Sequence, residues 1–230
     1  MRPIWQDAAL LALVVGAVYA NSTAGSFHYD DFHSLVLNPH IRSLEKLPTF
    51  FVDPGMFSVD AEKSMYRPLL LVSYALNYAW GGYGVAGYHG FNIAVHMLCT
   101  LFIWCLATEW GRGAALCAGL IFALHPVASE PVNYIVVRTE SLMGLCYLTA
   151  LYCAACNGRR WEIAAVAACA LGMASKESMV TAPLAACLID RAFGRPARQP
   201  TRGGKQKPGS GCRASGGPGA RPASPTAEEI

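Results

Sequence analysis

Long apolar blocks separated by short polar stretches constrain this chain more than any other feature of its sequence. A bilayer is spanned by a helix of about 20 apolar residues, and only helices or closed barrels satisfy their backbone groups inside it. Charged residues make up 14% of the chain, whereas soluble domains carry about 25%. The sequence therefore predicts an all-α, polytopic membrane protein with apolar blocks at roughly 4–20, 68–80, 90–108, 114–125, 141–156, 161–175 and 179–193.

The block at 68–80 decides the number of crossings. It is too short to span a bilayer, contains Asn77 and ends in glycine-rich sequence, so we expect an interfacial or re-entrant helix over 68–82. The bundle then has about six transmembrane helices, and a long loop at 21–67, carrying short interfacial helices, is extracytoplasmic. By the positive-inside rule the cytoplasmic face holds Arg2, Arg112, Arg159, Arg160 and Arg191. A spanning 68–80 block would give seven crossings, and charge counting alone does not exclude that arrangement.

The composition changes at about residue 193, where the polytopic domain of residues 1–193 is predicted to end. Residues 194–230 carry seven Lys/Arg and two Glu, which leaves eleven basic and thirteen acidic residues in 1–193. A basic, Gly/Pro/Ser-rich segment buries too little apolar surface to offset chain entropy, so this tail is predicted to be disordered. Attraction to anionic lipid headgroups and a merely solvated tail both fit its composition.

Two adjacent carboxylates, Asp30 and Asp31, stand out in the first loop. In an extended segment neighbouring side chains point to opposite sides, so only one can face a given substrate atom. This favours a division of labour, with one carboxylate as a general base and the other binding a partner, a metal ion or a backbone group. An ordinary acidic loop or a helix N-cap also fits the pattern.

Later polar clusters interrupt the apolar blocks. Arg67 precedes a proline and an apolar helix, where it can bind phosphate or reach toward headgroups. His89, Asn92 and His96 share one helix stripe, which predicts either a polar cavity or interhelical hydrogen bonds. Two further groups lie where proline breaks a block or where two blocks meet: His125, Glu130, Arg138 and Glu140, and Lys176 with Glu177.

Taken in order, these stretches carry a resemblance that none of them carries alone. The sequence reads "YDDFHSLVLNP", "YRPLLLVSYALNYAWGG", "YHGFNIAVHMLCTLF", "ALHPVASEPVNYIVVRTESL" and then "ASKES". Over roughly residues 5–190 it resembles the amino-terminal half of the transmembrane and tetratricopeptide-repeat O-mannosyltransferases. Those proteins are similar in turn to the wider GT-C class of membrane glycosyltransferases.

The resemblance implies a site on the extracytoplasmic face. Asp30 or Asp31 would take the proton from a Ser/Thr hydroxyl of a protein acceptor. The phosphate of a polyprenyl- or dolichyl-phosphate-linked sugar would meet Arg67, Arg138 or Lys176. It implies no firm cofactor and leaves a divalent metal ion at the acid pair as an open alternative. The pocket-lining residues are expected to be His89, His96, His125, Glu130, Glu140 and Glu177.

The resemblance also implies a location for the protein and the part of the family's length that it covers. It places the protein among membrane lipids, in the endoplasmic reticulum of a eukaryote or the inner membrane of a bacterium, with no nucleic-acid partner. Members of the family continue into further helices and tetratricopeptide repeats of 34 residues, whereas low-complexity sequence follows Arg191 here. We therefore expect the amino-terminal half only. A non-enzymatic membrane protein, transporter-like or lipid-binding, and an inactive truncated product remain the alternatives.

Overall fold

The apolar blocks all form helices in the computed structural model, which describes residues 4–156 and 158–192. The predicted disordered tail lies outside the described residues. Within them there is no strand, and the principal helices are α1 (Ile4–Tyr19), α2 (Pro68–Gly81), α3 (Val85–Ala107), α4 (Arg112–Leu124), α5 (Ser129–Asn133), α6 (Arg138–Ala155), α7 (Arg159–Met173) and α8 (Ala182–Ala192). The protein is thus an all-α membrane protein, as the sequence predicts.

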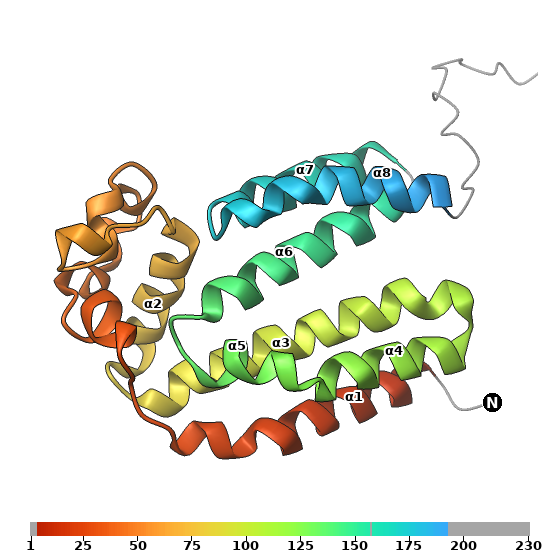
Figure 1. The fold of residues 1–230 in the computed structure, drawn as a ribbon, viewed down its shortest axis with the longest axis horizontal. Helices are drawn as coiled ribbons and strands as arrows, with labels where there is room; N and C mark the ends of the chain where they lie inside the picture. The colour runs from red at the N-terminus through yellow and green to blue at the C-terminus, as the bar shows by residue number, and fades with distance from the viewer. Residues whose placement is uncertain (1–3, 157, 193–230) are drawn as a thin grey trace, which may run out of the picture. The chain divides into compact units, whose positions relative to one another are not determined.

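The long helices pack side by side along one direction (Figure 1). Helices α1, α3 and α4 contact one another, α3 contacts α6, and α6 contacts α7 and α8. Two helical stretches, Trp5–Ala24 and Val85–Trp110, are long and apolar enough to cross a membrane. A third candidate is a bent pair, Arg112–Leu124 with Pro126–Asn133, which meets at an angle of 50°. Pro126 explains the bend, because proline cannot continue the hydrogen-bond ladder of a helix.

The loop between α1 and α2 is built from short helical turns rather than irregular chain. They are η1 (Ala20–Ala24), η2 (Phe32–Val36), η3 (Pro39–Arg42), η4 (Leu44–Lys46), η5 (Thr49–Phe51), η6 (Pro54–Phe57) and η7 (Ala61–Lys63). Side chains of Asn38, Ser43, Asp53 and Asp60 accept backbone N–H groups and so start four of these turns.

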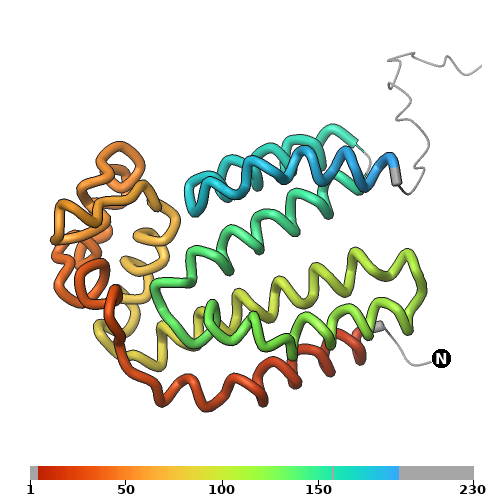
Figure 2. Tube along the Cα trace, in the orientation of Figure 1, coloured from red at the N-terminus to blue at the C-terminus, as the bar shows by residue number. Residues whose placement is uncertain are grey.

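Helix α2 belongs to this loop more than to the bundle. The tube in Figure 2 shows it beside the loop at one end of the long helices. Proline at its first position suits a helix start, and Gly82 at φ +57° ends it, since such a conformation favours glycine. The apolar core shared by the loop, α2 and its neighbours contains Leu35, Ile41, Phe50, Phe57, Leu70, Leu71, Tyr74, Ala75, Tyr88 and Ile135.

Two hydrogen bonds fix the end of the bundle at which the loop and α2 lie. The N–H of Leu69 in α2 donates to the carbonyl of Ala174, 3.0 Å away, just after α7. Thr139 at the start of α6 donates to the carbonyl of Ser175 at 2.8 Å. The start of α6, the end of α7 and the first loop therefore meet at the same end of the bundle.

The remaining short helices complete the turns between the long helices.

They are η8 (Thr108–Trp110), η9 (Pro126–Ala128) and η10 (Glu177–Thr181). Gly111, at φ +97°, separates η8 from α4, and this conformation is strained for any residue with a side chain. These short helices let the chain reverse direction at each end of the bundle.

Candidate functional site

Asp31 is fully buried and is bonded to backbone groups. Its Oδ2 accepts the N–H of His28 at 3.0 Å, and its Oδ1 accepts the N–H of Val136 at 2.8 Å. Burial raises the pKa of the Asp31 carboxyl, and the two amide hydrogen bonds oppose that shift. Because Val136 lies just before α6, this carboxylate ties the first loop to the α5–α6 connection.

The side chain of Asp30, unlike that of Asp31, is open to solvent. Its side chain is 55% exposed, and its backbone N–H donates to the Tyr134 hydroxyl at 3.2 Å. The two carboxylates thus have different environments, with Asp31 on backbone groups and Asp30 open to solvent, and their division of labour stays a prediction. The extended backbone assumed for it is wrong: Asp31 is helical, at φ −62° and ψ −28°. The two side chains still diverge because successive residues of a helix point about 100° apart.

A small polar cluster surrounds Asp30. The His33 Nε2 lies 3.3 Å from Asp30 Oδ1, and the His33 Nδ1 lies 2.9 Å from the Ser58 Oγ. The Lys63 Nζ is 3.8 Å from the same Asp30 oxygen. Tyr29, directly before the acid pair, has a φ of +38°, a strained backbone conformation for a residue with a side chain.

Arg138 is fully buried and donates four hydrogen bonds to neighbouring helices. Its Nε donates to Asn92 Oδ1 at 2.6 Å, and its Nη1 donates to Ser73 Oγ and Asn77 Oδ1 at 3.1 and 2.7 Å. Its Nη2 donates to the carbonyl of Tyr88 at 2.8 Å. Arg138 thus joins α2, α3 and α6, and this position gives no support to the expected contact with a donor phosphate.

The stripe of His89, Asn92 and His96 on α3 is buried and packs between helices. Asn92 also donates to the carbonyl of Val132 at 3.1 Å, and the His96 Nε2 lies 3.4 Å from the carbonyl of Ala123. Neither ring nitrogen of His89 has a hydrogen-bond partner within the described residues. Interhelical bonding, one of the two alternatives for this stripe, therefore describes Asn92 and His96, and His96 in addition reaches a cavity.

Lys176 forms an ion pair with Glu140 across the gap between α6 and the end of α7. The neighbouring carboxylate, Glu177, is exposed and does not take this role. Both partners of the pair are partly buried, with side chains 24% and 36% exposed. In the structure, the Lys176 ammonium at the loop end of the bundle is therefore bound by Glu140.

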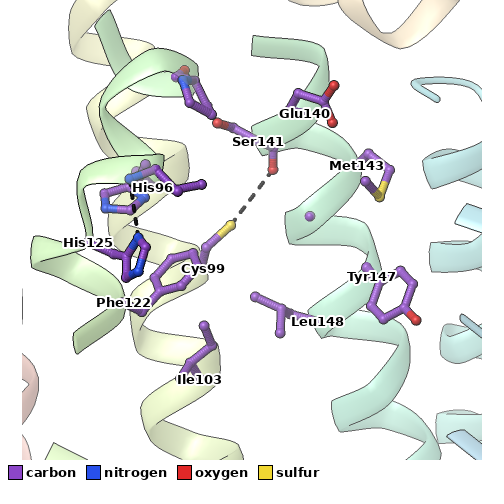
Figure 3. A pocket seen from close by; sticks show the side chains of 14 residues that line it. His96, Cys99, Ile103, Phe122, His125, Glu140, Ser141, Met143, Tyr147 and Leu148 are labelled. Atoms are coloured by element: carbon purple, nitrogen blue, oxygen red, sulfur yellow. Dashed lines mark hydrogen bonds between the residues drawn. The ribbon is translucent and has the colours of Figure 1, made fainter. Parts of the chain in front are cut away.

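An apolar cavity of about 420 Å³ lies between α3, α4 and α6. Figure 3 shows His96, Cys99 and Ile103 on one side and Glu140, Met143, Tyr147 and Leu148 on the other. His125 also lines it, beside the break between α4 and α5, whereas Glu130 is exposed and lies outside its lining. The cavity therefore unites three of the expected pocket residues, His96, His125 and Glu140.

A second cavity, of about 820 Å³, lies between the first loop and the end of α7. Arg67 and Glu177 line it together with Phe51, Met65 and Tyr66. The guanidinium of Arg67 lies 6.0 Å from the centre of the Phe57 ring. Arg67 is thus a cation that lines a cavity at the loop end of the bundle.

The acid pair does not fit a divalent metal ion. Both oxygens of Asp31 already accept backbone amides, and Asp30 points away from it. Across residues 4–156 and 158–192, no three metal-ligating side chains cluster. We therefore assign no metal ligands.

Comparison with known proteins agrees with this helical, membrane-embedded architecture. The family model described as dolichyl-phosphate-mannose-protein mannosyltransferase matches residues 82–201. The chain is 34% identical over 154 residues to protein O-mannosyl-transferase tmtc2 of Xenopus laevis, covering 64% of the chain and 18% of that relative. It is 36% identical over 151 residues to TMTC1 of Mus musculus, covering 62% and 16%. Against Tmtc1 of Drosophila melanogaster it is 30% identical over 182 residues, covering 75% and 21%.

The helices define an all-α membrane protein, and the matches place its sequence in the mannosyltransferase class. The chain belongs to the dolichyl-phosphate-mannose-protein mannosyltransferase family. It spans between 16% and 21% of the length of the three relatives named above. No solved structure matches it significantly.

Sequence reasoning missed the residues around Asp30. His33 follows it by three positions, which is one helical turn, so this neighbour had a local signal. Ser58 and Lys63 reach Asp30 and His33 only through the fold of the loop, and no spacing in the sequence points to them.

Proposed function

We propose that this chain forms the catalytic-loop part of a multi-pass membrane O-mannosyltransferase. The enzyme would transfer mannose from a dolichyl- or polyprenyl-phosphate donor to Ser/Thr hydroxyls of a protein. Its relatives bear the name protein O-mannosyl-transferase. The observation that carries the proposal is Asp30: a half-exposed carboxylate in the first loop, backed by the buried Asp31, at the end of the bundle that holds Lys176.

Six passes through the membrane fit the order of the helices, with α4 and α5 as one broken span and α2 outside the bilayer. Helix α2 has 14 residues and packs on the loop, which supports an interfacial position. The loop would then face the lumen of the endoplasmic reticulum in a eukaryote, or the periplasm in a bacterium.

The proposed reaction needs a base, a cation and space for a lipid. Asp30 takes the proton of the acceptor hydroxyl as its oxygen bonds to the anomeric carbon of the sugar. The bond from that carbon to the phosphate oxygen breaks, and the lipid phosphate leaves with the bonding electrons. Lys176 and Arg67 are the cations we assign to this phosphate.

The apolar cavity between α3, α4 and α6 is suited to the first part of the lipid tail. Its lining is mostly aliphatic and aromatic, and Glu140 on its wall binds the Lys176 ammonium. A phosphate beside Lys176 would therefore lie next to an apolar surface, as a polyprenyl phosphate requires.

Reconstitution separates this proposal from its non-enzymatic alternative. Proteoliposomes holding the protein receive dolichyl-phosphate-linked mannose and a Ser/Thr-rich peptide, and mass spectrometry measures peptide mannosylation. We expect mannose on the peptide and none with Asp30→Asn. Transport of a labelled solute without mannosylation would support a transporter, although ion-coupling acids are typical of membrane helices rather than loops.

A further inference from the structure

A chain of three side chains ends on the exposed carboxylate of the first loop. The Ser58 Oγ lies 2.9 Å from His33 Nδ1, and the His33 Nε2 lies 3.3 Å from Asp30 Oδ1. Ser58 is 6% exposed and the His33 side chain is 14% exposed, so both are shielded from solvent. Asp30 is the only member of the three that faces solvent.

The hydrogen bonds fix where the protons of this chain lie. The Ser58 Oγ accepts the backbone N–H of Asp60 at 2.9 Å, which leaves its own O–H free to donate. A carboxylate only accepts, so His33 Nε2 must carry the proton that faces Asp30. In the neutral ring, the His33 Nδ1 is then the acceptor for the Ser58 O–H, and this one tautomer satisfies every contact.

The ring is also held in place by its own segment. The backbone N–H of Val59 donates to the His33 carbonyl at 3.2 Å, and the Phe57 ring lies 6.3 Å from the His33 ring. The turn η2 and the segment after η6 are thus joined both through the backbone and through Ser58. The orientation of His33 follows from this connection.

We propose that His33, oriented by Ser58, is the positioning residue for Asp30. Its N–H holds Oδ1 and stabilises the charged carboxylate, which leaves Oδ2 to meet the acceptor hydroxyl. No hydrogen bond to Asp30 Oδ2 is present among the described residues. This inference rests on the proposed role of Asp30 as the base, and it adds to it two residues that set the direction and ionisation of that base.

Other charged or titratable residues near Asp30 include Asp31, Lys63 and Tyr134. The Lys63 Nζ lies 3.8 Å from Oδ1, and Asp31 is the next residue in the chain. Tyr134 meets the backbone N–H of Asp30 rather than its side chain. Removal of His33 therefore weakens one of two stabilising contacts of the charged form and leaves the Lys63 contact in place.

Carbodiimide labelling of Asp30 tests this coupling without any need for activity. Carbodiimide with an amine nucleophile modifies carboxyl groups less readily as they ionise, and peptide mass spectrometry reads each site separately. We expect His33→Phe to raise the pH at which half of Asp30 reacts by about one unit. His33→Gln, whose amide can donate in place of Nε2, should restore at least half of that shift.

Substitutions of Ser58 give a second test of the same contact, and they perturb the fold less than substitutions of His33. Ser58→Ala should shift the Asp30 midpoint in the same direction by less, and Ser58→Thr should leave it unchanged. Glu62, an exposed carboxylate on the same loop, is the internal control in every sample. An Asp30 midpoint that is the same in wild type, His33→Phe and Ser58→Ala would overturn the proposal.

Measurements of mannosyl transfer then distinguish the role of Asp30 as the base from the role of His33 as its positioning residue. If Asp30 is the base, the acid limb of the pH–rate profile in His33→Phe moves to higher pH in step with the labelling midpoint. An Asp30→Asn variant that keeps full activity would refute the base while the labelling result still stands. An unshifted labelling midpoint with an inactive Asp30→Asn variant would refute only the role of His33.

Discussion

Asp31 and Val136 are joined by a hydrogen bond of 2.8 Å although 105 positions separate them in the sequence. The bond brings the acid pair of the first loop to the start of α6. Two residues later in the chain, Arg138 joins α6 to α2 and α3. The first loop, α2 and the start of α6 are therefore one connected structure, and Asp30 is an exposed carboxylate on it.

Asp31 should make stability depend on pH. Burial raises the pKa of its carboxyl, so the folded state binds the proton more tightly than the unfolded state. Its contribution to stability is fully present below the unfolded pKa of about 4 and is lost as the pH rises through the folded pKa. Thermal unfolding in detergent should show the wild type losing stability relative to Asp31→Asn as the pH rises above 4.

Glu62→Gln serves as the matched control, because Glu62 is exposed on the same loop. Its stability should follow that of the wild type at every pH. If the difference in thermal midpoint between the wild type and Asp31→Asn stays constant with pH, burial does not control the ionisation of Asp31.

Asp30→Asn should abolish most mannosyl transfer without loss of folding. The amide cannot take the acceptor proton, and general-base help is typically worth 10²–10⁴-fold. We expect kcat to fall by at least about 100-fold, with yield and elution volume on size exclusion unchanged. Glu62→Gln is the control, and equal kcat values for the two variants would contradict the assignment.

Arg138→Met should destabilise the fold, because it leaves acceptors on α2 and α3 without their donor. Breaking such a buried network costs about 2–4 kcal/mol. We expect a clear fall in the thermal midpoint and only partial recovery with Arg138→Lys, since an ammonium lacks the planar fork of the guanidinium. A stable Arg138→Met variant with a raised KM for the donor would instead restore Arg138 as a phosphate ligand.

Lys176 and Glu140 should affect donor binding through one shared interaction. Lys176→Ala removes a charged hydrogen bond to the phosphate, so we expect the KM for the donor to rise about tenfold or more. Glu140→Ala should change it less, and the double variant should match Lys176→Ala, because Glu140 acts by holding the ammonium. Additive effects in the double variant would show that the two residues act independently.

The helices were predictable because long apolar blocks are typical of helices that are removed from water, either in a protein core or in a membrane. The block at 90–108 became α3 (Val85–Ala107), and the block at 141–156 became α6 (Arg138–Ala155). The break in the fourth block followed from Pro126 and Pro131. Local pattern also identified Asp30, Asp31 and Lys176 as charges in an apolar context that require a physical explanation.

Partnerships between distant residues could not be predicted in the same way. Glu140 has Arg138 two positions before it and Lys176 far along the chain, yet only tertiary packing selects Lys176. Arg138 has the residue type of a phosphate ligand, but its burial depends on where α2 and α3 pack. Ser58 carries no signal of its own, since its position beside His33 comes from the folding of the loop.

In the proposed topology the acid pair and the later cations share one membrane surface, and accessibility labelling measures this arrangement. Single cysteines replace Glu62, Glu130, Glu177 and Glu109 in a protein whose native cysteines have been removed. A membrane-impermeant maleimide applied to the extracytoplasmic side should label positions 62, 130 and 177, and position 109 only after the membrane is opened. Labelling of position 62 from one side and of 130 or 177 from the other would contradict the account.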